Sequence, residues 1–373
     1  MAWVEHRGTR WRVRFRTADG TVGTGSSHAT FAAAELRCKQ VDIDQAYDTY
    51  LEPASGRISL ADWVTVWEAG HQAGPAKRAT YDSYLRTHIL PRFGYTPINK
   101  ITRQDAKVFV KHLHSRLADR TVADVMSLLS LLLREAVADR RIGFNPCHGI
   151  RVSTGHPVER TPATAQQINA ITDRIRRRSD QILVITAAYT GMRWGELAGL
   201  AKTNTHLGDG LISIHPQVGA LHEVGGHLYL GPPKSAASVR DIHLPPFLVG
   251  LLQDVIDNHD HDLVFCGAHG AWLRRSAMAR RVWRSAVDHH DDRPDPRRHA
   301  LSRHPAHPQD LADRGRHPEI AQARRLGHRL PGIRGVYSHV TPVMIARITD
   351  SLQARWQASH APTPLPHRHL HAA

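Results

Sequence analysis

The sequence of 373 residues contains few cysteines and no long hydrophobic run. The longest apolar stretch, Ile182 to Tyr189, is broken by Thr186 and falls far short of the ~20 residues that a membrane helix needs. The N-terminus carries arginine and tryptophan where a signal peptide would be apolar, which predicts no secretion signal. An odd number of widely spaced cysteines argues against a disulfide framework and favours a reducing, cytoplasmic location. The cysteines are Cys38, Cys147 and Cys266.

Acidic residues are also fewer than basic residues. There are 49 Lys and Arg against 34 Asp and Glu, which gives a formal net charge of +15. The basic excess is spread along the chain and favours a polyanionic partner, most simply nucleic acid. The alternative is a soluble protein that is merely basic. Hydrophobic residues make up 41% and charged residues 22%, which excludes wholesale disorder. At ~100–200 residues per domain, the length predicts two or three domains.

Residues 1–50 are predicted to form a small basic domain of strands and one helix. Apolar residues and arginines alternate over 11–16, the period of a strand with one apolar and one cationic face. Asp19 and Gly20 indicate a hairpin turn, and a helix is expected over 30–44. The arginine face could contact DNA, or its charges could protect a solvated edge strand from aggregation. The three arginines are Arg12, Arg14 and Arg16.

Residues 58–150 are predicted to form a helical domain. Apolar residues over 122–136 recur at the spacing of a helix packed on a core. Earlier helices are expected at 60–69, 77–89 and 104–117. Basic side chains in this region fit phosphate contacts, although single lysines are commonly just solvated. The candidates are Lys77, Arg78, Arg86 and Lys107.

The remaining chain is predicted to hold a third domain. Residues 151–163 have two prolines and no apolar period, which indicates a linker before a domain at 164–358. Thr341 and Pro342 form an N-cap signal for a helix over 342–357, and 359–373 is predicted to be disordered. Strands are expected over 211–215, 227–230 and 239–244.

Four local features of the third domain could carry chemistry. In AAYTGMRWGELAGL, Gly191 ends one helix and Arg193 begins the next, beside free backbone N–H groups that suit an oxyanion or phosphate. Taken alone, the motif favours a surface Arg193 paired with Glu196. In GPPKSAASVRDIHLPP, a hairpin is expected with Lys234 at its turn and with Ile242 and Leu244 facing inward. Lys234 could reach a phosphate or donate a proton, or be a solvated turn lysine.

The other two features are RRLGHRLPG, which holds His328, and GVYSHV, which holds Tyr337. A tyrosine has a free pKa of about 10 and needs neighbouring cations to become a nucleophile. Each residue alone could instead belong to the core.

Together, the order and spacing of the four features resemble the tyrosine recombinase, or phage integrase, family. The shared motifs are TGxR, the PPKSxxSxR segment, LGH and a tyrosine nine residues after that histidine. The resemblance extends to residues 1–50 as an arm-type DNA-binding domain and to 58–150 as a helical, SAM-like core-binding domain. It implies a multidomain fold, mainly α with small β-sheets, that ends in a mixed α+β catalytic domain.

The resemblance implies DNA strand transfer without metal or cofactor. Tyr337 would attack a phosphodiester to leave a 3′-phosphotyrosine, and Lys234 would protonate the 5′ leaving oxygen. Arg193 and His328 would stabilise the phosphate oxygens. It also implies a bacterial, nucleoid-associated protein that forms a tetramer on attachment-site DNA, with an accessory bending or excision factor as a further partner. The C-terminal helix resembles one that family members dock on a neighbouring protomer, and packing within its own chain is the alternative.

The sequence departs from the family at one box, HxxRH, expected about 31 or 32 residues before the tyrosine. Here residues 302–319 read SRHPAHPQDLADRGRHPE, without HxxR and without a helical apolar period. Arg303 follows His299 by four residues rather than three and is at most a weak substitute for the second arginine. Nearby prolines disfavour the expected helix. They are Pro294, Pro296, Pro305, Pro308 and Pro318.

A shifted reading frame would explain this departure. Codons for residues 302–318 can be chosen so that the frame one nucleotide later encodes HDIRHTHKTWLIEDGI. That peptide contains HxxRH, and its arginine falls across Pro305 and Ala306, where 337 − 306 = 31. We therefore expect a chain that binds DNA but cleaves it poorly, because losing one donor from an oxyanion site costs ~10²–10³ in rate.

Three rival functions follow from the same sequence. A decayed integrase or regulator would keep the DNA contacts without the chemistry. A topoisomerase would share the chemistry, but the three-part layout favours recombination. A histidine-rich metal protein would draw on His259 and His261 or on His289 and His290, whose spacing fits no common metal site.

Overall fold

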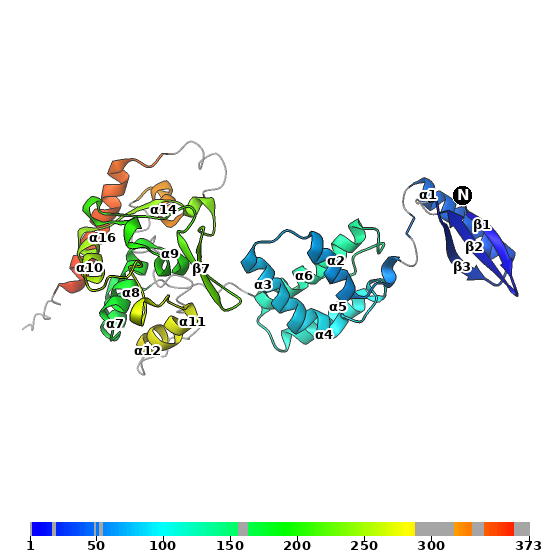
Figure 1. Ribbon diagram of the computed structural model, residues 1–373, viewed down its shortest axis with the longest axis horizontal. Coiled ribbons are helices and arrows are strands. Elements are labelled where there is room, and N and C mark those ends of the chain that lie inside the picture. The colour runs from blue at the N-terminus through cyan, green and yellow to red at the C-terminus, as the bar shows by residue number, and fades with distance from the viewer. Residues whose placement is uncertain are drawn as a thin grey trace, which may run out of the picture. The chain divides into compact units, whose positions relative to one another are not determined.

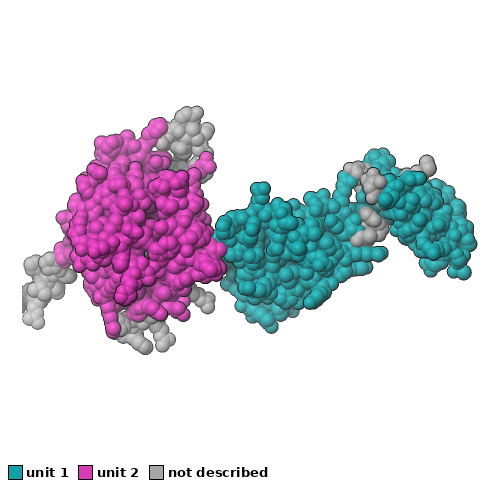
Figure 2. Space-filling model, in the orientation of Figure 1, with its two compact units in different colours: residues 1–157 teal, residues 158–373 magenta. Residues whose placement is uncertain are grey.

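The computed structural model describes residues 2–16, 20–47, 50–51, 55–155, 163–287, 317–329 and 339–361. The chain divides into two compact units, Met1–Pro157 and Val158–Ala373 (Figure 2). Three separate hydrophobic clusters lie within them, one in the N-terminal sheet, one among the following helices and one in the second unit. The predicted fold class, mainly α with small sheets, is confirmed. Arg303, Tyr337 and residues 362–373 lie outside the described residues.

The N-terminal element is an antiparallel sheet in the order β1-β2-β3 with one helix (Figure 1). Val13 and Phe15 are fully buried, while Arg16 is exposed and Arg12 and Arg14 are partly exposed, so the predicted alternation holds. A side chain at Gly23 would lie 2.6 Å from the Phe15 ring, so the glycine makes room for that ring. The elements are β1 (Ala2–Arg7), β2 (Arg10–Arg16), β3 (Val22–His28) and α1 (Phe31–Ala46).

The helical part of the first unit is built on α6. Its predicted apolar stripe is buried, and Trp63 from α2 donates a hydrogen bond from Nε1 to the Leu132 carbonyl at 2.9 Å. The helix predicted over 77–89 continues through a wider helical turn, Leu85–Ile89, directly into α4. The helices are α2 (Leu60–Gly70), α3 (Pro75–Tyr84), α4 (Leu90–Phe93), α5 (Arg103–His114) and α6 (Asp119–Ala138).

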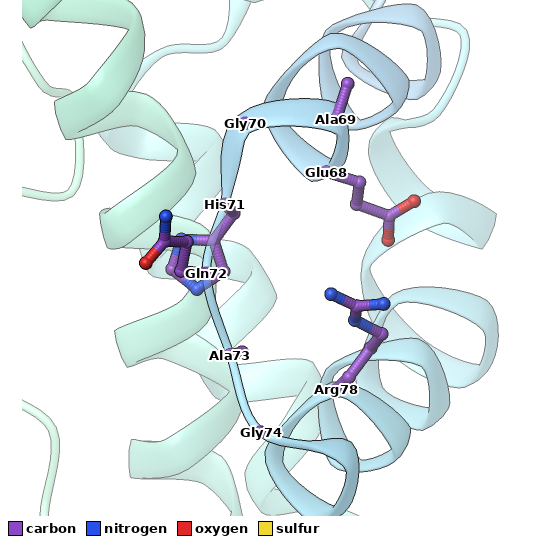
Figure 3. Close-up of a pocket in the computed structure, with 8 residues that line it drawn as sticks. All are labelled: Glu68, Ala69, Gly70, His71, Gln72, Ala73, Gly74 and Arg78. Atoms are coloured by element: carbon purple, nitrogen blue, oxygen red, sulfur yellow. The ribbon is translucent and has the colours of Figure 1, made fainter.

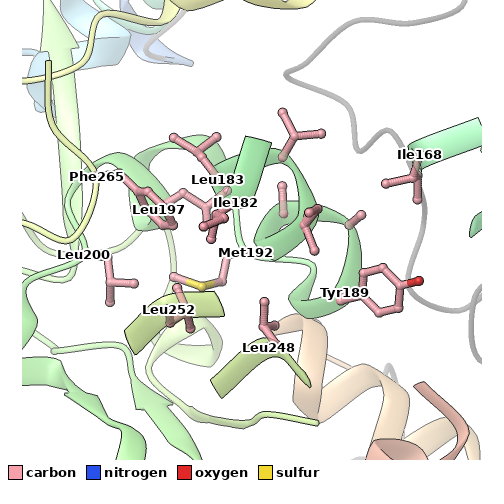
Figure 4. Packing of buried hydrophobic residues seen from close by; sticks show 14 of the residues in the cluster. Ile168, Ile182, Leu183, Tyr189, Met192, Leu197, Leu200, Leu248, Leu252 and Phe265 are labelled. Atoms are coloured by element: carbon pink, nitrogen blue, oxygen red, sulfur yellow. The ribbon is translucent and has the colours of Figure 1, made fainter. Parts of the chain in front are cut away.

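The second unit is organised around α8 (Arg178–Thr190), in which every residue from Ile182 to Thr190 is buried. A helix that is apolar on all sides needs partners on all sides. Figure 4 shows Ile182, Leu183 and Tyr189 among core residues from neighbouring helices. The other helices are α7 (Ala165–Asp173), α9 (Trp194–Ala198), α10 (Pro246–Asp257), α11 (Arg275–Met278), α12 (Arg284–Val287), α14 (Glu319–Leu326) and α16 (Pro342–His360).

The strands of this unit correct one prediction. Lys234 does not lie at a hairpin turn, because the hairpin pairs β6 with β7 and turns at Gly225 and Gly226. Lys234 lies in the segment between β7 and β8, and β8 pairs with β5 instead. Ile242 and Leu244 are buried as predicted. The strands are β4 (Thr205–His206), β5 (Leu211–Ser213), β6 (Ala220–Val224), β7 (His227–Gly231) and β8 (Asp241–His243).

Helix α16 packs within its own chain. Ile348 and Leu352 are buried in the core of the second unit, and the Trp356 ring stacks on Phe247 of α10 with centroids 4.2 Å apart. The helix continues to His360, so the first two residues of the predicted tail are helical. Of the two alternatives for this helix, the described residues therefore adopt the one within the chain. None of the described helices is long and apolar enough to cross a membrane.

Candidate functional site

Arg193 is fixed where α8 gives way to α9. Gly191 ends α8 with a positive φ of 70°, which a residue with a side chain rarely adopts. Arg193 caps α9, and its backbone N–H donates to Glu196 Oε2 at 3.0 Å. Its Nη1 donates to Glu196 Oε1 at 2.9 Å. The helix start and the ion pair predicted from the sequence are therefore both present.

Two other segments hold the same guanidinium. Nη1 donates to Ser238 Oγ at 2.6 Å, and Nη2 donates to the Gly327 carbonyl at 3.3 Å. The Arg193 side chain keeps 28% exposure, while Glu196 keeps 2%. The alternative of a simple surface pair is therefore wrong, because the carboxylate is buried and the guanidinium is oriented. An arginine held this way and still open to solvent suits an anionic oxygen.

Sequence reasoning missed the residue behind this arrangement, Arg240. Its side chain is fully buried and its Nη2 lies 3.0 Å from Glu196 Oε2. The sequence does contain a sign that Arg240 is buried, because the predicted strand over 239–244 places it on the same inward face as Ile242 and Leu244. A buried arginine needs a carboxylate or several carbonyls to compensate its charge, and Arg240 has both.

Arg325, on α14, adds a second buried guanidinium. It donates to the carbonyls of His243 at 2.6 Å and Tyr189 at 2.9 Å. Burial, and secondly repulsion from Arg240, lower the pKa of Arg325 to about 10. Arg193 and Arg240 both pair with Glu196, and Arg240 also donates to the Arg325 carbonyl, so three arginines and one carboxylate belong to one cluster. The cluster therefore carries an excess of positive charge that favours an anion at its open side.

Lys234 and His328 lie on the segments that form this cluster. Lys234 is exposed next to Ser235, whose Oγ shares a hydrogen bond of 2.9 Å with Ser238 Oγ. His328 is exposed, follows Gly327 and donates its backbone N–H to the Ala323 carbonyl at 2.9 Å. The structure thus brings the segments of Arg193, Lys234 and His328 together. Tyr337 and the weak substitute Arg303 lie outside the described residues.

Replacing Gly327 with alanine should destabilise the second unit by more than the cost of placing alanine at a positive φ. Gly327 has φ +63°, and a Cβ there would lie 2.9 Å from Arg240 Nη1 and 3.0 Å from the Ala237 carbonyl. Gly210 is a matched control, with φ +64° and no atom within 4 Å of its Cβ position. We expect Gly210→Ala to cost about 1 kcal/mol and Gly327→Ala at least about 2 kcal/mol of unfolding free energy in urea. Equal losses would contradict the close packing around Gly327.

The predicted DNA-contacting residues of the helical part are exposed. Lys77 and Arg78 lie on α3, Arg86 follows in the wider turn and Lys107 lies on α5. A hollow of about 560 Å³ lies between α2 and α3, and Figure 3 shows Glu68 and Arg78 pointing toward one another across it. Among the described residues, none that is predicted to be catalytic lines this hollow. Among the described residues, no group of acidic, histidine and cysteine side chains could hold a metal ion.

Comparisons with known proteins identify the family of the chain. Residues 161–343 match the model of the phage integrase family, and residues 59–114 match that of the phage integrase N-terminal SAM-like domain. A prophage phiRv2 integrase of Mycobacterium tuberculosis (strain H37Rv) is 30% identical over 266 residues, which cover 67% of each chain. Prophage integrase IntR of Escherichia coli (strain K12) is 29% identical over 125 residues, 34% of this chain and 29% of that one. The chain belongs to the phage integrase, or tyrosine recombinase, family.

Solved structures show the same fold. The Tn1549 transposon integrase in complex with a circular intermediate DNA matches with a TM-score of 0.60 and 19% identity, over 81% of this chain and 99% of that one. A lambda integrase tetramer bound to a Holliday junction matches with a TM-score of 0.55 and 15% identity, over 92% and 98%. Both likenesses support the fold class, mainly α with small sheets.

Proposed function

We propose that this protein is a site-specific DNA recombinase that cuts and rejoins DNA for integration or excision of a mobile element. The observation that carries the proposal is Arg193, which is held by Glu196, Ser238 and Gly327 yet remains open to solvent. Family membership and the relatives named as prophage integrases support it. The integrase structures in complex with DNA support double-stranded DNA as the partner.

The proposed chemistry is a transesterification. The Tyr337 phenol loses its proton to solvent, and its oxygen attacks the scissile phosphorus, which forms a phosphotyrosine bond to the 3′ side as the bond to the 5′ oxygen breaks. Lys234 gives its proton to the leaving 5′ oxygen. Arg193 and His328 stabilise the charge on the non-bridging oxygens in the transition state. The reverse reaction with a second 5′-hydroxyl rejoins the strand, so no energy-supplying cofactor is required.

DNA binding is proposed for two basic surfaces. One is the arginine face of β2, although Arg14 also lies 3.6 Å from Glu5. The other consists of the exposed cations Lys77, Arg78, Arg86 and Lys107. Both would contact phosphates without reading sequence. Assembly as a tetramer on attachment-site DNA in the bacterial cytoplasm, with an accessory bending or excision factor, belongs to the same proposal.

A second candidate function is a DNA-binding remnant of an integrase with impaired catalysis. The observation that favours it is the sequence of residues 302–319, which lacks HxxR and contains three prolines. Such a protein would occupy attachment sites through the same basic residues, without the second arginine that completes the phosphate clamp. The two candidates differ only in the rate of covalent chemistry.

Covalent capture of DNA tests the proposed function. A nicked suicide duplex made from the direct repeats that flank the gene should become linked to the protein and migrate as a heavier band in a denaturing gel. Tyr337→Phe should abolish that band and leave DNA binding unchanged, because it removes only the attacking oxygen. Capture by Tyr337→Phe at the rate of the unaltered chain would reject Tyr337 as the nucleophile. Binding without capture by the unaltered chain would favour the remnant.

A further inference from the structure

Arg240 lies where three segments of the second unit meet. Its guanidinium is fully buried, and each of its nitrogens donates to a different segment. Nη2 donates to Glu196 Oε2 at 3.0 Å and Nη1 to the Ser238 carbonyl at 2.8 Å. Nε donates to the Arg325 carbonyl at 2.7 Å. One planar side chain therefore joins the start of α9, the segment before β8 and the end of α14.

Each of these segments carries one residue of the proposed site. Arg193 begins the first segment, Lys234 precedes Ser238 in the second, and His328 follows Arg325 in the third. We infer that Arg240 is a positioning residue that orients Arg193 toward an anionic phosphate oxygen. The inference rests on the proposed function in one respect, namely that phosphate is the group that Arg193 binds.

The route from Arg240 to Arg193 runs through Glu196. Glu196 Oε2 accepts from Arg240 and from the Arg193 backbone N–H, while Oε1 accepts from Arg193 Nη1. Without Arg240, one carboxylate oxygen loses its charged partner, and the plane of the carboxylate is no longer fixed. If the carboxylate plane rotates, Glu196 Oε1 moves, and this oxygen is the acceptor that orients the Arg193 guanidinium.

A second route runs through Ser238. Its carbonyl accepts from Arg240 while its Oγ accepts from Arg193 Nη1 at 2.6 Å. The same backbone position is therefore fixed on one side by Arg240 and holds Arg193 on the other. Lysine cannot replace Arg240 in this role, because a single ammonium cannot match the fork of donors that reaches three acceptors.

Binding of inorganic phosphate tests the inference without any cleavage. The midpoint of thermal unfolding of the full-length protein is measured as phosphate replaces chloride at constant ionic strength. Arg193→Lys defines the part of the response that belongs to the site. We expect Arg240→Lys to weaken the apparent phosphate affinity by about tenfold or more, because the loss of a charged hydrogen bond typically has an effect of this size. Arg274→Lys is the matched control, since Arg274 pairs with Glu223 outside the cluster, and its response should not change.

A double-mutant cycle tests whether Arg240 acts through Glu196. Glu196→Gln keeps the side-chain size and should weaken phosphate binding to a similar extent. The double variant should be no weaker than either single variant, because both changes remove the same orientation of Arg193. If Arg240→Lys does not unfold cooperatively, Glu196→Gln with Arg274→Lys as its control carries the test.

Two outcomes would overturn the inference. One is an Arg240→Lys protein with unchanged phosphate affinity while Arg193→Lys loses it. The other is an unaltered chain that shows no phosphate response dependent on Arg193. Failure of the proposed function looks different, because DNA capture would then be absent in every variant while the phosphate response still depended on Arg240. Capture together with unaltered phosphate binding in Arg240→Lys would reject the positioning role alone.

Discussion

Replacing residues 302–317 with HDIRHTHKTWLIEDGI should raise the rate of covalent DNA capture by ~10²–10³-fold or more. The replacement has the same 16 residues, counted as 317 − 302 + 1, and leaves Pro318 and the following helix in place. It supplies HxxRH, with the arginine at position 305, and 337 − 305 = 32 matches the family spacing to Tyr337. The second guanidinium would share the phosphate charge that Arg193 would otherwise meet alone.

The control separates the box from a general repair of the segment. The same replacement with alanine in place of the box arginine should lose most of the gain, while its DNA affinity stays within a few-fold. Tyr337→Phe in the restored chain should capture nothing. Equal capture rates for the unaltered and the restored chain would contradict the proposed impairment.

The encoding DNA provides an independent check on the cause. If the frame was shifted, the codons for residues 302–318 spell the box in the frame one nucleotide later. Codons that cannot encode HxxR there would end the frameshift hypothesis, yet the capture experiment would still measure what the missing box costs. Cause and consequence are thus tested by different observations.

The predictable parts of the fold are those with strong periodicity. The apolar stripe over 122–136 forms a buried face of α6. It could be predicted because seven apolar positions at helical spacing lie on one side of a helix. The hairpin with Lys234 at its turn was wrong for a local reason. Gly225 and Gly226, flanked by alternating residues, form a two-residue turn that pairs β6 with β7 in a sheet of their own, while β8 pairs with β5.

The candidate site was predictable in part. Arg193 follows a glycine that ends a helix, and the motif and the local structure agree there. Arg240 and Arg325 were missed because a charged residue is ordinarily assigned to the surface, and only contacts between distant segments show how their charge is satisfied. The packing of α16 within the chain was also undecided, because an apolar face at Ile348 and Leu352 fits either location.

In the restored chain, Arg193→Ala should lower the rate of covalent capture by ~10²–10³-fold, equivalent to about 3–4 kcal/mol of transition-state stabilisation. The charge on the phosphate oxygens grows during attack, so a donor already oriented by Glu196, Ser238 and Gly327 acts mainly on the transition state. DNA affinity should change by only a few-fold, because a chain of net charge +15 keeps its other phosphate contacts.

The matched control for Arg193→Ala is Arg274→Ala. Arg274 also pairs with a glutamate, Glu223, but at 45% exposure and outside the cluster, so capture should stay within a few-fold. The fold should survive Arg193→Ala, because Glu196 keeps its buried pair with Arg240. A drop in DNA affinity as large as the drop in capture would place Arg193 among the residues that bind DNA in the ground state. A drop in capture alone would place it at the reacting phosphate.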